Sequence, residues 1–290
     1  MALPRPDSRH RAWPRAGIAC LLLASIAWGL VTPRPACAQT EGVPTQSYHW
    51  AIVNLFYDGD YKNALSRFQS EWRSAVKAGQ LRWIDSICYS TMMGECYYHM
   101  GDLPQALENY TAAVNLFLNY PDWMIRVRFS GIQVARASPQ TPWGASTRGS
   151  QLGHYPTRTP MLQGSVDTSM RYKDGGMVQQ PMMYPVEVHE IVRCTVLAIR
   201  RRAELLGPLS KYDALNRKVL TAVQQPITQR NHWSQAYADA ELGVALLANG
   251  RDAQAATALT RAAVAQGQFD HHLTATVLLE LGKLSLRQGN

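Results

Sequence analysis

The chain has 290 residues, of which 46% are hydrophobic and 17% are charged. This composition excludes an intrinsically disordered protein and indicates a packed core. The formal net charge is +8, but residues 1–38 hold five Arg and one Asp, a net of +4, so the rest of the chain carries 8 − 4 = +4. A charge this modest, without a basic stripe, disfavours nucleic acid as a partner.

The N-terminal segment has the pattern of a secretory signal. Four arginines come first, at positions 5, 9, 11 and 15, and an apolar run follows over residues 18–31. The run is shorter than the roughly 20 residues that a membrane span needs. The small residues Ala36 and Ala38 then provide a cleavage site. We therefore predict a signal peptide over 1–38, an exported protein that is periplasmic or secreted, and no stable membrane span after cleavage. The alternative is a retained signal anchor.

The segment after the leader contains Cys88, Cys96 and Cys194. An odd number permits one disulfide and one free thiol. Cys88 and Cys96 lie eight residues apart on one predicted helix, a rise of about 12 Å. Because a disulfide needs Cα atoms within about 7 Å, these two cannot pair. We interpret all three as small buried hydrophobic residues, and their spacing is not that of metal ligands.

An internal repeat is the strongest signal in the sequence. A glycine such as Gly94 or Gly243 allows two helices to approach closely, and a second glycine seven residues later ends the first helix in a left-handed conformation. A buried alanine and a large apolar residue follow on the partner helix. The repeat-defining residues are Gly59, Ala64 and Phe68; Gly94, Gly101, Ala106 and Tyr110; and Gly243, Gly250 and Ala255.

This pattern resembles the tetratricopeptide repeat (TPR) family over roughly residues 45–120 and 230–290. The spacing departs from the family, because Ala64 and Ala106 are 42 residues apart whereas the family repeats about every 34. The resemblance implies an all-α fold of antiparallel helical hairpins stacked into a short α-solenoid. We predict helices near 45–58, 61–78, 81–100, 103–119, 122–137, 186–206, 229–249, 251–266 and 268–288.

A Pro- and Gly-rich stretch over 138–185 divides N-terminal hairpins, 39–137, from a C-terminal helical region, 186–290. Aromatic residues are scattered through this insert. We expect it to be irregular, with short strands, and to pack on the helices through its aromatic side chains. The alternative is a disordered linker.

No catalytic motif is present. We therefore predict that the protein is not an enzyme and needs no cofactor or metal. The less favoured alternative is an enzyme that uses acid–base residues of the insert, whose candidates are His154, Asp167, Tyr172, Lys173 and Asp174. The run Arg200-Arg201-Arg202 is interpreted as a solvated helix face, with a binding patch as the alternative.

In the TPR family the first helix of each hairpin lines a concave groove. The resemblance therefore gives peptide-groove candidates in the first two hairpins: His49, Val53, Phe56 and Tyr57, then Thr91, Met92, Glu95, Tyr98 and His99. Such a groove would be aromatic and would suit an apolar or extended peptide. The alternative is that these side chains are core or are covered by the insert. The predicted function is a non-enzymatic scaffold that binds another polypeptide outside the cytoplasm, and the alternative is a self-associating structural module of the cell envelope.

The last predicted helix carries more leucines than one face can hold. Gly282 takes the close-contact position of the repeat, and Val277 and Leu281 set an inward stripe. Leu279, Leu284 and Leu286 cannot all share that stripe, so apolar surface should remain outside. We therefore expect association through the C-terminal helix.

Overall fold

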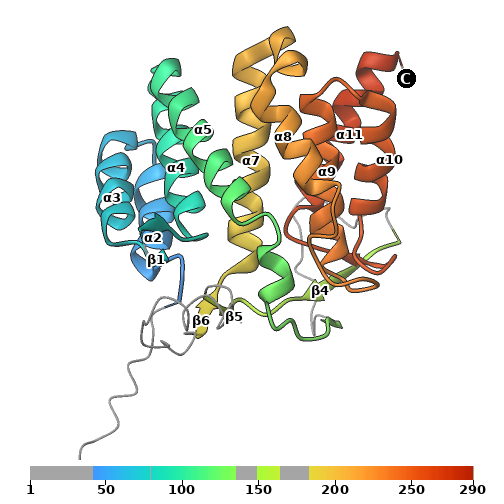
Figure 1. Cartoon of the computed structure of the whole chain (residues 1–290), viewed down its shortest axis with the longest axis horizontal. Coiled ribbons are helices and arrows are strands. Elements are labelled where there is room, and N and C mark those ends of the chain that lie inside the picture. The colour runs from blue at the N-terminus through green and yellow to red at the C-terminus, as the bar shows by residue number, and fades with distance from the viewer. Residues whose placement is uncertain (1–41, 79, 135–148, 164–182, 290) are drawn as a thin grey trace, which may run out of the picture. The chain divides into compact units, whose positions relative to one another are not determined.

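A computed structural model describes residues 42–78, 80–134, 149–163 and 183–289. The predicted signal peptide and parts of the insert lie outside these ranges. Most of the described residues are helical, which agrees with the coarse expectation of an all-α fold. Figure 1 shows the helices side by side, with α2 and α3 at one end of the array and α10 and α11 at the other.

The described residues form the following helices and strands, given in chain order. The helices are α2 (Gln46–Ala51), which continues into the π-helical segment η1 (Ile52–Phe56), α3 (Tyr61–Ser74), α4 (Ser86–His99), α5 (Leu103–Asn119), the 3₁₀ turn η2 (Trp123–Arg126), α7 (Val188–Leu206), the 3₁₀ segment η3 (Gly207–Tyr212), α8 (Ala214–Val223), α9 (Gln235–Ala248), α10 (Asp252–Ala262) and α11 (Thr274–Gln288). The strands are β1 (Lys77–Ala78), β2 (Leu81–Arg82), β3 (Gln133–Val134), β4 (Gln151–His154), β5 (Thr159–Leu162), β6 (Met183–Val186) and β7 (Phe269–Asp270).

The same turn joins α2–η1 to α3, α4 to α5, and α9 to α10. Its glycine has a left-handed φ each time, +83° at Gly59, +83° at Gly101 and +69° at Gly250. The next residue returns a backbone hydrogen bond to the first helix: Asp60 N to Leu55 O at 2.9 Å, and Asp102 N to Tyr97 O at 2.9 Å. The prediction of left-handed helix ends at these glycines is confirmed.

The close-contact positions also behave as predicted. A β-carbon at Gly94 would lie 2.6 Å from the ring of Tyr110, and one at Gly243 would lie 2.5 Å from the side chain of Leu259. Ala106 and Ala255 are fully buried, at 0% exposure. Ala64 and Phe68 occupy the equivalent buried positions of the first hairpin. These small residues let the antiparallel helices of each hairpin pack closely.

Neighbouring hairpins pack against one another in chain order. α4 contacts α3 and α7 as well as its partner α5, and α7 also contacts α5 and α9. α10 then contacts both α9 and α11. One continuous apolar core results, because each helix pair leaves a face that only its neighbour can bury.

Helix α8 was not predicted. Its Asp213 side chain accepts a hydrogen bond from Asn216 N and caps its first turn, and Val219, Leu220 and Val223 are buried. Gly207 and Pro208 follow directly on the end of α7, and the amphipathic pattern after them is short, which makes it a weak signal for a further helix. The segment η3 contacts both α7 and α8, and each of these two helices packs on α5 and α9.

The predicted helix over 122–137 is wrong within the described residues. Only the 3₁₀ turn η2 forms, and the chain then runs extended into β3. Val127 bridges Met161, and β3 pairs antiparallel with β4. Side chains 127–130 alternate between more and less buried positions, a period of two that belongs to a strand and not to a helix.

Some helix boundaries also differ from the predictions. The third predicted helix, 81–100, begins only at Ser86, because residues 77–82 form the antiparallel pair β1–β2. α3 therefore ends at Ser74. α9 begins at Gln235 and α11 at Thr274, later than predicted, because turns precede both helices.

The described parts of the insert contain short strands and pack on the helices. β5 pairs with β6 just before α7, and β4 pairs with β7 between α10 and α11. Tyr155 packs edge-on against Trp233 with 5.1 Å between ring centroids, and Tyr184 lies 5.3 Å from Trp83. In these segments the expectation of docking through aromatic side chains is confirmed. Within the described ranges no helix combines the length and apolar character that a bilayer span requires.

Candidate functional site

The predicted groove of the second hairpin is filled by α7. Thr91 is buried and donates a hydrogen bond to the carbonyl of Cys194 at 3.2 Å. Met92 is only 2% exposed, and its sulfur lies 3.6 Å from the Arg193 guanidinium. The prediction that these two residues line an open groove is therefore wrong, because α7 lies along this face of α4.

Glu95 is likewise buried and serves as an anchor between helices. Its carboxylate accepts hydrogen bonds from the Tyr110 hydroxyl at 2.5 Å and from Arg201 Nε at 3.0 Å. This contact joins α4, α5 and α7. Burial next to the Glu95 carboxylate raises the pKa of the Tyr110 hydroxyl, so the tyrosine remains a hydrogen-bond donor. Glu95 is thus a structural residue and is not available to a peptide.

The three consecutive arginines are not a solvated face. Arg202 is 6% exposed and pairs with Asp213 at 2.8 Å, whereas Arg201 binds Glu95 and Arg200 lies 3.5 Å from Glu280 of α11. Each arginine therefore joins α7 to another element, and the interpretation as a solvated face is wrong. The guanidinium of Arg201 also stacks 4.1 Å over the ring of Tyr98.

An exposed apolar stripe lies on the first helix, and we call Trp50, Val53 and Tyr57 the N-terminal strip. These side chains are 51%, 60% and 71% exposed. The three side chains follow one another at intervals of three and four residues along α2, η1 and the residue after η1. Val53 and Tyr57 were predicted groove residues. Trp50 was missed, although its spacing from Val53 is a sufficient signal.

Two further predicted groove residues border the strip at its Tyr57 end. Phe56 is partly buried, and the ring of His99 lies 5.5 Å from it and stacks on Tyr61 at 4.9 Å with an interplanar angle of 10°. His99 thereby connects the second hairpin to the first. The strip is therefore flanked at its Tyr57 end by packed aromatic rings.

The last two groove candidates, His49 and Tyr98, are both engaged by other parts of the chain, and Tyr98 is the residue under the Arg201 guanidinium. The Nε2 of His49 lies 2.7 Å from the buried carboxylate of Glu187, which also pairs with Arg158 of the insert at 3.2 Å. Interaction with the adjacent Glu187 carboxylate raises the pKa of His49. This contact fastens α2 to the start of α7 and to the insert, so His49 supports the strip without belonging to its open surface.

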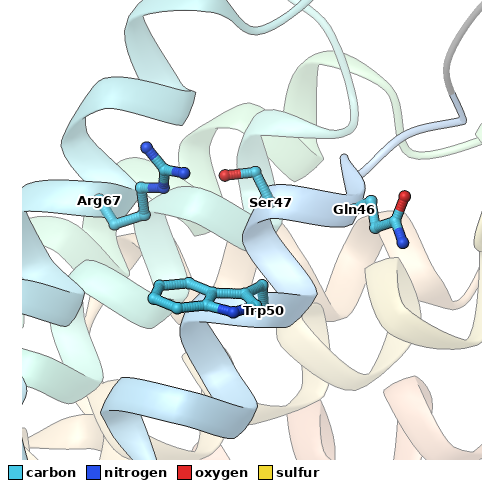
Figure 2. A pocket seen from close by; sticks show the side chains of 4 residues that line it. All are labelled: Gln46, Ser47, Trp50 and Arg67. Atoms are coloured by element: carbon cyan, nitrogen blue, oxygen red, sulfur yellow. The ribbon is translucent and has the colours of Figure 1, made fainter.

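A hollow of about 460 Å³ opens beside the strip, lined by Gln46, Ser47, Trp50 and Arg67. Figure 2 shows the side chain of Ser47 pointing towards Arg67, with the indole of Trp50 extended below them. In the described part of the chain the Arg67 guanidinium has no hydrogen-bond or ion-pair partner. The hollow therefore places an aromatic face next to an available cation and a hydroxyl.

The side chains that line the hollow offer contacts for a ligand. A guanidinium beside an exposed indole suits a carboxylate carried next to an apolar side chain. Within the described residues, no group of three or more His, Cys, Asp or Glu side chains is placed to hold a metal ion. Of the acid–base candidates in the insert only His154 is described; it is exposed on β4, and the other four lie outside the described ranges.

Comparison of the chain with protein-family models, with curated proteins and with solved structures finds no match.

Proposed function

We propose that this chain is an exported TPR-like scaffold, periplasmic or secreted, that holds another polypeptide and catalyses no reaction. The stacked hairpins would then form a short α-solenoid, and the N-terminal strip would be its binding surface. The observation that carries the proposal is the exposure of Trp50, Val53 and Tyr57 along one helix face. Large apolar side chains gathered in a band favour a protein partner over permanent contact with water.

The charges near the strip favour a particular kind of peptide. Arg67 lies beside Trp50 at one end, and Asp58 follows Tyr57 in the exposed turn at the other. An extended segment with an acidic residue at the Arg67 end and apolar side chains along the strip would match both the shape and the charge. A basic residue at the far end would meet Asp58.

A displayed library of random dodecapeptides, selected against the full chain, tests this proposal. We expect enriched sequences to carry large apolar residues next to an Asp or Glu. Their affinity, measured by fluorescence anisotropy, should fall at least tenfold in the double variant Trp50→Ala/Tyr57→Ala, because truncated aromatic anchors typically cost about 2 kcal/mol or more.

A matched control uses exposed apolar residues away from the strip. Leu209 and Tyr212 of η3 are 68% and 66% exposed. The variant Leu209→Ala/Tyr212→Ala should bind the selected peptides within about twofold of the wild type, as expected for surface residues outside the interface. Equal losses in both double variants, or a library without enriched sequences, would count against the strip.

Self-association is the second candidate function, and α11 provides a specific observation for it. Leu278, Leu279 and Leu286 are 38%, 51% and 78% exposed at the C-terminal end of the helical array. Repeat arrays ordinarily end on a polar face. A second copy of the chain that covers these leucines would give a structural module instead of a peptide receptor.

A further inference from the structure

A buried polar cluster joins α2, α4 and α7 at the centre of the N-terminal half. The hydroxyl of Tyr48 donates to the Glu190 carboxylate at 2.5 Å, and Arg193 binds the same carboxylate through two nitrogens at 2.6 and 2.7 Å. The sulfur of Cys194 lies 3.5 Å from the Tyr48 oxygen and 3.6 Å from Arg193. The Glu190–Arg193 ion pair is thus satisfied by hydrogen bonds, and the Cys194 thiol lies beside it.

A second thiol completes this cluster from the facing helix. Cys88 of α4 is 0% exposed, as is Cys194 of α7, and both are free thiols. The side chains of Cys88 and Cys194 lie next to each other where α4 packs on α7. One helical turn further along α4, Thr91 donates to the backbone carbonyl of Cys194, which fixes the alignment of the two helices at this level.

We propose that Cys88 and Cys194 are a covalent cross-link site and form a disulfide in an oxidising compartment. The two S–H bonds break and one S–S bond forms, while two protons and two electrons pass to an oxidant. A small-molecule disulfide such as oxidised glutathione accepts them and leaves as two thiols. The third cysteine, Cys96, remains a free thiol, because it lies on α4 about 12 Å along the helix from Cys88.

The position of this bond gives it a structural consequence. Residues 88 and 194 lie on opposite sides of the insert in the sequence, so the disulfide closes a loop of about 100 residues. It would hold the first hairpins to α7 even after the insert is cut. Because both thiols are fully buried in the folded chain, a soluble oxidant reaches them most readily while the chain is folding.

The test is refolding of the reduced full-length chain in a buffer of oxidised and reduced glutathione. Free thiols are then alkylated in denaturant and the non-reduced digest is mapped by mass spectrometry. We expect a peptide pair that joins Cys88 to Cys194, low alkylation of these two residues and nearly complete alkylation of Cys96. Reduction should lower the Tm by roughly 10 °C, as expected for a long closed loop.

Two variants provide controls. Cys96→Ser should retain the Cys88–Cys194 peptide, whereas Cys194→Ser should leave both Cys88 and Cys96 fully alkylated. The measurement on the wild-type chain does not depend on whether a variant folds. Complete alkylation of Cys88 and Cys194 in the folded wild type, or a bond from either one to Cys96 or to a second chain, would overturn the proposal.

Discussion

Gly94 lies so close to the ring of Tyr110 that a β-carbon at position 94 would be 2.6 Å from the Cε1 atom. The ring cannot easily move away, because it is fully buried and its hydroxyl is held by Glu95. The same relation exists between Gly243 and Leu259, where the β-carbon would meet a more flexible aliphatic side chain at 2.5 Å. These contacts set how closely the two helices of each hairpin approach.

Gly94→Ala is therefore expected to destabilise the fold by about 1–3 kcal/mol, since overpacking costs this much in a filled core. Gly243→Ala should cost less, because Leu259 can change its rotamer. Gly282→Ala is the matched control: Gly282 is exposed on α11 with no atom within 4 Å of an added β-carbon, so the substitution should stabilise by roughly 0.5–1 kcal/mol. Chemical denaturation measures all three, and the opposite order would contradict the account.

Gly282 was predicted to take the close-contact position of another hairpin, and this prediction is wrong. Within the described residues no partner helix covers Gly282.

Ala106→Leu tests the second close contact. Ala106 is fully buried between α5 and its neighbours, and three extra carbon atoms should cost about 1–3 kcal/mol. Ala112 lies on the same helix with its side chain exposed, so Ala112→Leu should change stability by less than about 0.5 kcal/mol. Thermal melting of the two variants decides the matter, and equal Tm values would show that position 106 has room.

Glu241 gives a prediction about pH. Its carboxyl group is fully buried with no hydrogen-bond partner in the described part, and burial raises its pKa from 4.5 to about 8. The folded state therefore holds a proton that the unfolded state releases above pH 4.5, and stability is lost as the pH rises from 4.5 towards 8. The loss approaches about 1.4 kcal/mol per pH unit within that window.

Glu241→Gln removes this titration while keeping the shape of the side chain. The variant should be about as stable as the wild type at pH 5 and more stable by a few kcal/mol at pH 8. Glu108→Gln, at an exposed position of α5, is the matched control and should change stability by less than about 0.5 kcal/mol. Urea denaturation at four or five pH values checks this, and a constant gap between Glu241→Gln and the wild type would refute the buried neutral carboxyl.

Association through α11 predicts a loss of oligomer on substitution of its outer leucines. Leu279→Glu/Leu286→Glu should give a monomer by light scattering at tens of micromolar, whereas the wild type should be dimeric or larger. Leu284 is not suited to this test, because it is 2% exposed and Leu284→Glu would damage the core. A wild type that is already monomeric would leave the apolar face of α11 without a role in self-association.

The sequence predicted those features that depend on neighbouring residues. Left-handed glycines and buried alanines follow from the local geometry of a hairpin, so Gly101, Ala106 and their equivalents could be found from spacing alone. The burial of Met92 could not be predicted in this way, because α7, the helix that covers it, comes about 100 residues later in the sequence and after the insert. The stretch after η2 was wrongly predicted to be helical because it is rich in apolar residues. Their burial alternates with a period of two over 127–130, which is typical of a strand.

The candidate site also contains residues that could be predicted from local spacing and residues that could not. Val53 and Tyr57 were identified from their positions in the repeat, and both are exposed in the structure. The hollow at Trp50 also needs Arg67 of α3. The two side chains come to line one hollow only because α2 packs on α3. Spacing along one helix could have identified Trp50 but not its partner.

The most direct test of the central claim is hydrogen–deuterium exchange of the full chain with and without a saturating selected dodecapeptide. If the N-terminal strip binds polypeptides, amides of α2 and η1, over 46–56, should exchange at least severalfold more slowly with peptide bound, and those of α11 should be unchanged. The Trp50→Ala/Tyr57→Ala variant should lose this protection at the same peptide concentration. Protection that falls on α11 or elsewhere while 46–56 exchanges at its free rate would contradict the claim.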